Sequence, residues 1–169
     1  MGLSVKLMND LSDGLKGRRN LITDVGGVKV GQVTIDDGDV HSGVTAILPH
    51  TGNLFRHKVP AASCVLNGFG KSVGLVQIDE LGTIETPIVM TNTFGVGTAL
   101  NALTKQMLAD NPEIGDTTST VNLIVAECND GDVSNIRKMA ITEQNVSDAL
   151  AAVNDDFEEG AVGSGRGMM

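Results

Sequence analysis

The chain has 169 residues, which matches the size of one domain and leaves little room for a second. Its 12 Lys and Arg against 21 Asp and Glu give a formal net charge of −9, so phosphate backbones and anionic membrane surfaces are repelled and neither nucleic acid nor a membrane is expected as a partner. With 4 Phe and no Trp or Tyr, the composition excludes any site that needs a tyrosine proton donor or a Tyr or Trp stacking platform.

The first residues of the chain are polar and contain no apolar stretch of the kind found in a secretory signal peptide. Residues such as Lys6 and Asp10 interrupt every apolar stretch there, and no apolar run approaches the roughly 20 residues that span a bilayer. We therefore expect residues 1–20 to form a polar arm, ordered structure to begin near Leu21, and residues 21–169 to belong to one domain. The protein is expected to be soluble and cytoplasmic.

Short runs rich in β-branched residues, separated by glycine, follow the arm. The first run alternates Val28, Val30 and Val33 with polar residues, which is typical of a half-buried strand. At this spacing the runs predict antiparallel hairpins of a β-sheet. The expected strands span residues 28–35, 44–48, 62–66, 75–78 and 87–90.

The hydrophobic pattern then changes its period. Apolar residues at three- and four-residue steps predict an amphipathic helix over 94–109, ended by Asn111 and Pro112. A strand is expected over 120–127, and a second helix over 143–153 with Thr142 as its N-cap. Many strands followed by helix, strand and helix indicate an α+β fold, with helices packed on a mostly antiparallel or mixed sheet.

Two glycine-containing segments partly match nucleotide-binding motifs. Residues 67–72 (NGFGKS) end like a phosphate-binding loop, but Val65 stands where a glycine is required, and we interpret the segment as a tight turn between strands. Residues 94–100 (FGVGTAL) open a helix, but Leu100 occupies the third glycine position of a dinucleotide fingerprint. Two uses remain open for these small residues: close packing of helix on sheet, or a site for an anionic group.

The histidines and cysteines lack the spacing of a metal site. No spacing of His41, His50 and His57 places two ligands on one helix face, so we expect surface or turn histidines. Cys64 and Cys128 lie in apolar, strand-like runs without CxxC spacing, and we expect small, reduced core residues. The residues predict neither a metal nor another cofactor.

Residues 127–132 (ECNDGD) form a dense polar cluster at the end of the predicted strand. Loops after strands commonly display binding groups, and these side chains suit a cation or a substrate ammonium. An Asn-Asp-Gly sequence is also ordinary turn chemistry, so both interpretations remain open. The residues themselves identify no nucleophile, because no serine elbow and no evident Ser–His or Cys–His pair is present.

Seven segments, spread over nearly everything after Asn20, form a pattern more specific than any single motif. They are residues 22–33 (ITDVGGVKVGQV), 41–50 (HSGVTAILPH), 65–72 (VLNGFGKS), 78–93 (IDELGTIETPIVMTNT), 111–116 (NPEIGD), 118–131 (TSTVNLIVAECNDG) and 162–168 (VGSGRGM). In this order they resemble the N-terminal portion of the DmpA-type family, which includes L-aminopeptidase/D-amidase-esterases and β-aminopeptidases.

The resemblance implies part of an αββα sandwich similar to the N-terminal-nucleophile hydrolases. It also implies a precursor that cleaves itself just before a serine. This serine then begins a second, β chain, and its freed α-amine takes the proton of its own hydroxyl. The implied substrates are short peptides, amides or esters with a free N-terminal amine. The family's β chain, and further copies in a homo-oligomer, are the implied protein partners.

The family's catalytic serine and its supporting groups are assigned to no residue of this chain, because they lie beyond the matching part. We therefore expect a truncated N-terminal part, incomplete at its C-terminus and inactive alone, in which nothing anchors the glycine-rich residues 160–167. A degenerate, non-catalytic homologue that acts as a binding or structural subunit is the alternative. A more distant one is an acyltransferase similar to ornithine acetyltransferase.

The resemblance also suggests site residues. Glu127 matches an acidic position suited to the substrate ammonium, and Asn67 and Asn92 are weaker candidates for substrate binding. Asp132 aligns with the family's oxyanion-hole tyrosine. An ionised aspartate repels an oxyanion, so either another group donates there or catalysis is impaired.

Overall fold

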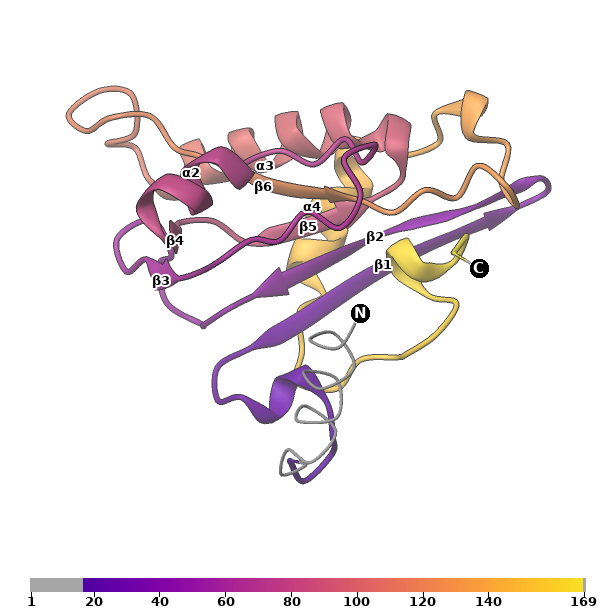
Figure 1. Ribbon diagram of the computed structural model, residues 1–169, viewed down its shortest axis with the longest axis horizontal. Coiled ribbons are helices and arrows are strands. Elements are labelled where there is room, and N and C mark those ends of the chain that lie inside the picture. The colour runs from indigo at the N-terminus through magenta and orange to yellow at the C-terminus, as the bar shows by residue number, and fades with distance from the viewer. Residues whose placement is uncertain (1–16, 169) are drawn as a thin grey trace, which may run out of the picture.

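The computed structural model describes residues 17–168, and a mixed four-stranded sheet lies at its centre. The elements in chain order are η1 (Ile22–Asp24), β1 (Lys29–Asp37), β2 (Val40–Leu48), β3 (Val59–Pro60), α2 (Leu75–Leu81), β4 (Thr83–Ile84), β5 (Ile88–Thr91), η2 (Thr93–Gly95), α3 (Val96–Asp110), β6 (Ile124–Glu127), η3 (Ile136–Lys138), α4 (Glu143–Ala151) and η4 (Gly163–Gly165). The sheet order is β1-β2-β5-β6; β5 and β6 are parallel, and the other pairs are antiparallel. Helices α3 and α4 cover one face (Figure 1).

The main core lies between this sheet and the two helices. Val44, Val89 and Val125, from three neighbouring strands, are fully buried in one cluster with Leu103 of α3. Gly31 lets α4 pack directly on β1, because a Cβ at this position would lie 2.0 Å from a carbonyl oxygen of α4. The predicted α+β class with a mixed sheet is therefore confirmed.

Both predicted helices are present, with small differences at their ends. Thr142 caps α4 as predicted, and its Oγ1 accepts the Asn145 N–H at 3.2 Å. At the start of α3, a Cβ on Gly95 would lie 3.0 Å from Thr91 Oγ1 and from Ile141 Cγ1. Of the two uses left open for the small residues there, the structure shows close packing at this position.

Two of the predicted strands are wrong. Residues 62–66 form no regular element, and residues 75–78 lie in helix α2. Gly74 and Gly82 bound this helix with left-handed φ values of 95° and 65°. These two glycines start and stop a short helix, and they outweigh the strand preference of the β-branched residues inside it.

The strand predicted over 120–127 is only half present. Its second half is β6, but the Asn122 N–H donates to Glu85 Oε1 at 2.8 Å, and the Asn122 side chain donates to Gly74 O at 3.2 Å. These contacts tie the first half to α2 and β4. There Ile78, Ile84 and Ile124 form a second, smaller core.

The glycine-rich C-terminal segment is anchored, contrary to the prediction. It packs on the β1/β2 hairpin, where the Gly163 N–H donates to Thr34 Oγ1 at 2.8 Å and the Ser164 N–H donates to Thr45 Oγ1 at 3.0 Å. A Cβ on Gly43 would lie 2.2 Å from Gly163 O, so only glycine permits this approach. The anchor depends on partners more than a hundred residues away, which a linear pattern does not display.

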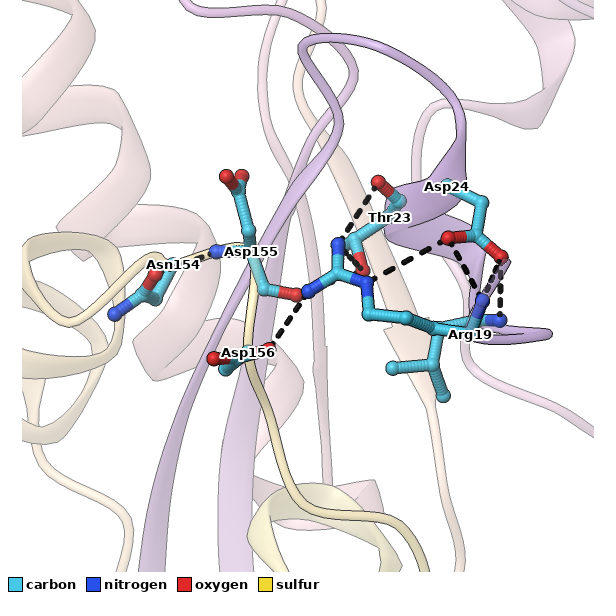
Figure 2. A network of polar contacts seen from close by, with 7 residues as sticks. Arg19, Thr23, Asp24, Asn154, Asp155 and Asp156 are labelled. Atoms are coloured by element: carbon cyan, nitrogen blue, oxygen red, sulfur yellow. Dashed lines mark hydrogen bonds and ion pairs between the residues drawn. The ribbon is translucent and has the colours of Figure 1, made fainter. Parts of the chain in front are cut away.

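Most of the predicted N-terminal arm, residues 1–16, lies outside the described residues. Order begins before Leu21, however, because the Arg19 guanidinium donates to Asp156 Oδ1 at 2.7 Å and to Thr23 Oγ1 at 3.2 Å (Figure 2). The Thr23 hydroxyl in turn donates to Asp155 O at 2.7 Å.

Within residues 17–168, none of the helices combines the length and apolar character that a membrane crossing requires.

Candidate active site

Glu127 is the last residue of β6, and its carboxylate is held from two sides. Oε1 accepts the Thr93 hydroxyl at 2.5 Å, and Oε2 accepts the backbone N–H of Lys71. A carboxylate has about four acceptor positions, so two donors leave room for a further one. The side chain is partly exposed. Glu127 is therefore a positioned anion with unused acceptor capacity.

The topology of the sheet explains this position. Because β5 and β6 are parallel, with Thr91 opposite Glu127, the residues that follow both strands meet at one edge of the sheet. Cys128 continues the contact, since its N–H donates to Thr91 O at 2.8 Å. Such edges of parallel strands are common places for ligand sites in α/β proteins.

Two predicted substrate-binding residues lie near this edge but have local roles. Asn92 is 3% exposed, and its Oδ1 accepts the Gly95 N–H at 2.8 Å as the N-cap of η2. Asn67 is exposed in the loop before α2, where its Oδ1 accepts the Phe69 N–H at 2.8 Å. Asn67 also lines a cleft of about 310 Å³ formed by residues 64–75.

The remaining predicted site residue, Asp132, is exposed on the turn that follows Glu127. Two positions earlier, Asp130 is 1% exposed, and neither of its carboxylate oxygens has a hydrogen-bond partner within residues 17–168. Gly167 packs against it, because a Cβ on Gly167 would lie 2.3 Å from Asp130 Cβ. Buried carboxylates without partners are unfavourable, so the structure predicts that Asp130 lowers stability.

Replacing Asp130 with Asn is therefore expected to stabilise the chain. The neutral amide has nearly the same volume and a smaller desolvation penalty than an unpaired carboxylate, so the free energy of unfolding at pH 7 is expected to rise by about 1 to 3 kcal/mol. Urea unfolding measures the difference. The matched control is Asp132→Asn, an exposed substitution expected to change stability by less than about 0.5 kcal/mol. A less stable Asp130→Asn variant would contradict the argument.

The histidines and cysteines are dispersed in the structure. His41 Nδ1 pairs with Asp36 Oδ1 at 2.5 Å, and His50 Nε2 lies 2.8 Å from His57 O. Within the described part of the chain, no group of three or more His, Cys, Asp or Glu is arranged to hold a metal ion.

Cys64 is exposed in a loop, so its prediction as a core residue is wrong. Cys128 is half-buried, and burial raises the pKa of its thiol.

Residues 67–72 are also not the predicted turn between strands. They form a loop that leads, through Gly74, into helix α2. The Lys71 ammonium donates to Phe69 O at 2.6 Å and lies 3.4 Å from the centre of the Phe69 ring. The backbone N–H of Lys71, and not its ammonium, contacts the Glu127 carboxylate.

Sequence reasoning missed the groups that position Glu127. Thr93 and Lys71 are far from it in sequence, and only the parallel arrangement of β5 and β6 identifies the first of them. Asp130 belongs to the polar cluster over residues 127–132, but the sequence does not distinguish it from its neighbours. Its signal is burial, which a turn-like sequence does not reveal.

Comparisons with known proteins agree with this architecture. The β-peptidyl aminopeptidases BapA of Sphingosinicella xenopeptidilytica and Sphingosinicella microcystinivorans are similar to the chain, with 33% identity over 167 residues and 34% over 165 residues. These matches cover 93% and 92% of this chain, but only 41% and 40% of those proteins. The chain thus spans less than half the length of these relatives.

Two solved structures are also similar. The PH0078 protein from Pyrococcus horikoshii OT3 superposes with a TM-score of 0.89 at 49% identity, over 92% of this chain and 46% of that one. The L-aminopeptidase D-Ala-esterase/amidase from Ochrobactrum anthropi, described as a new variant among the Ntn hydrolase fold, superposes with a TM-score of 0.82 at 35% identity, over 92% and 46%. The predicted fold relationship is confirmed. Because the model of peptidase family S58 also matches residues 20–169, the chain belongs to that family.

Proposed function

We propose that this chain supplies the amine-binding part of an aminopeptidase active site, with Glu127 as the group that binds the substrate's N-terminal ammonium. The position of the Glu127 carboxylate carries the proposal. It is fixed by Thr93 and Lys71 and retains acceptor capacity. Gly70 and Ser72, which line an open cleft, also lie next to Glu127. The relatives named as aminopeptidases support the reaction class.

The chemistry of an ammonium fits this arrangement. A carboxylate is its natural partner, because charge-assisted hydrogen bonds are about twice as strong as neutral ones. The net charge of −9 also favours the approach of cationic over anionic substrates. Since a free amine distinguishes aminopeptidase substrates from internal peptide bonds, Glu127 would select for chain ends.

The bond-breaking step is proposed to need groups that this chain does not supply. No described residue is assigned as the nucleophile, and the relatives are more than twice as long as the part matched here. Asp132 remains only a proposed counterpart of an oxyanion residue. When ionised it has no proton to donate, so the oxyanion donors would come from other groups.

The test is whether binding depends on a free amine. Titrating leucinamide into the ¹⁵N-labelled chain is expected to shift the amide resonances of Lys71 and Glu127, whereas N-acetyl-leucinamide, which has no charge at that nitrogen, leaves them in place. Leucinamide is expected to stay unhydrolysed in the same sample. Equal shifts with both ligands, or none with leucinamide, would refute the proposed amine site.

A further inference from the structure

A second hollow region lies at the edge of the sheet remote from Glu127. Pro87 directly precedes β5, and Leu48 ends β2, which runs antiparallel to β5, so both residues lie where β5 begins rather than where it ends. Two adjoining clefts open there, of about 250 Å³ and 130 Å³. The lining residues that they share are Leu48, Pro87, Gln106 and Asp110. These two clefts together are called the distal groove below.

The lining of the distal groove is mostly apolar. Its apolar residues are Leu48 and Pro87 at the strand ends, Leu150 and Ala151 in the last turn of α4, and Met107 in the last turn of α3. Apolar walls with a few placed polar groups are the usual composition of a small-molecule site.

Two asparagines fix one wall of the smaller cleft. Asn111 is 1% exposed, its side-chain amide donates to Met107 O at 3.0 Å, and its Oδ1 accepts the Asn53 side-chain amide at 2.6 Å. Both asparagines belong to the lining. Because their contacts tie the loop after β2 to the end of α3, this wall is held in place by the fold.

The electrostatics of the distal groove favour a cation. Among the described residues that line it, Asp110 alone is ionised, and its Oδ2 accepts the Gln106 side-chain amide at 2.9 Å, which leaves further acceptor positions. Helix α3 ends at Asp110 and α4 ends at Ala151, and neither helix has a basic residue in its last turn. The partial negative charges at both helix ends therefore add to that of the carboxylate.

Neighbouring lysines do not enter the lining. Lys29 stands opposite Leu48 in the sheet, and Lys105 precedes Gln106, but neither lines either cleft. The Lys105 ammonium instead pairs with Glu143 at 2.7 Å. The distal groove thus combines apolar walls with one anionic group and without a cationic one in its lining.

We propose that the distal groove binds an organic cation with an apolar body, at a site separate from Glu127. The ammonium of the ligand contacts the Asp110 carboxylate, and its apolar body lies against Leu48, Pro87 and Leu150. Burying this body gains about 25 cal/mol per Å² of apolar surface. The larger cleft, of about 250 Å³, accommodates a phenyl ring on a short chain. The inference does not depend on the role proposed for Glu127.

The experiment titrates the ¹⁵N-labelled 169-residue chain with 2-phenylethylammonium, which is expected to shift the amide resonances of Gln106 and Leu150. Ethylammonium keeps the charge without the ring and is expected to bind at least about tenfold more weakly, and 3-phenylpropionate, with the opposite charge, most weakly. Shifts at Lys71 and Glu127 report separately on the proposed amine site, so the failure of one site is distinguishable from that of the other. Unshifted Gln106 and Leu150 resonances, or equal Kd values for the three probes, would refute the inference.

Two variants locate the binding in the distal groove. Asp110→Asn removes the charge of an exposed side chain and is expected to raise the Kd of 2-phenylethylammonium about three- to tenfold. Ala151→Leu fills the larger cleft from an exposed position and is expected to raise the Kd at least about threefold. Asp37→Asn and Ala109→Leu make the same changes at exposed residues outside the lining, and each should leave the Kd within about twofold. An unchanged Kd in both groove variants would overturn the proposal.

Discussion

The Glu127→Gln variant is expected to bind leucinamide about 10- to 100-fold more weakly than the unmodified chain. The substitution keeps the size of the side chain and one oxygen acceptor but removes the negative charge. Hydrogen bonds to charged groups contribute about 1.5 to 3 kcal/mol, and each 1.4 kcal/mol corresponds to about a factor of ten in affinity. NMR titration or isothermal calorimetry measures the loss.

The control must separate a role in binding from a role in structure, because Glu127 also accepts hydrogen bonds from Thr93 and Lys71. Glu159→Gln removes the same charge from an exposed residue and is expected to leave the affinity within about twofold of the original, since exposed, distant charges are screened. The thermal midpoint of each variant reports on folding. Equal losses of affinity in Glu127→Gln and Glu159→Gln would show that net charge, not the site, governs binding.

The largest effect on stability is expected from Lys58→Met. Lys58 pairs with Glu85, which is 5% exposed and also accepts the Asn122 N–H at 2.8 Å and the Gln77 side-chain amide at 3.3 Å. Removing Lys58 leaves a buried carboxylate without its cation. Because the Lys58 side chain is itself partly exposed, we expect a loss of about 2 to 3 kcal/mol at pH 7, below the value typical of fully buried pairs.

The same pair predicts a pH dependence with a definite sign. Burial by itself would raise the pKa of the Glu85 carboxyl, but the hydrogen bonds from Lys58, Asn122 and Gln77 outweigh it and hold the pKa below its usual value. A carboxyl pKa that is lower in the folded than in the unfolded chain stabilises the fold above the unfolded value. This contribution is lost as the pH falls through the folded value. The difference between Lys58→Met and the original chain is therefore expected to shrink below about pH 4.

Urea unfolding at a series of pH values checks both expectations. The double variant Lys58→Met/Glu85→Gln has no buried charge and keeps an acceptor for the Asn122 N–H, so it is expected to recover most of the stability. Lys105→Met breaks the exposed Lys105–Glu143 pair and is expected to lower stability by less than about 0.5 kcal/mol. Equal effects of Lys58→Met and Lys105→Met would contradict the assignment of a buried pair.

The elements that the sequence predicts correctly are those whose signal is local. The hairpin β1/β2 has alternating side chains and a glycine turn, and α4 has its N-cap Thr142 and an apolar face. The composition of helix α2 favours β structure and so predicts a strand, whereas the glycines at its ends decide its conformation. The prediction that Cys64 is a core residue depends on a strand over 62–66, and both are wrong because this segment is an exposed loop.

The sequence by itself determined the α+β class, the family resemblance and the position of Glu127 at a strand end, because each depends on residue order or on short-range periodicity. The tertiary structure alone decided which groups surround that carboxylate. Thr93 and Lys71 meet Glu127 because β5 and β6 run parallel and the loop before α2 returns to their edge. Burial of Asp130 under Gly167 likewise depends on the anchoring of a distant segment. Contacts between residues this far apart come from the packing of whole elements, which no local pattern encodes.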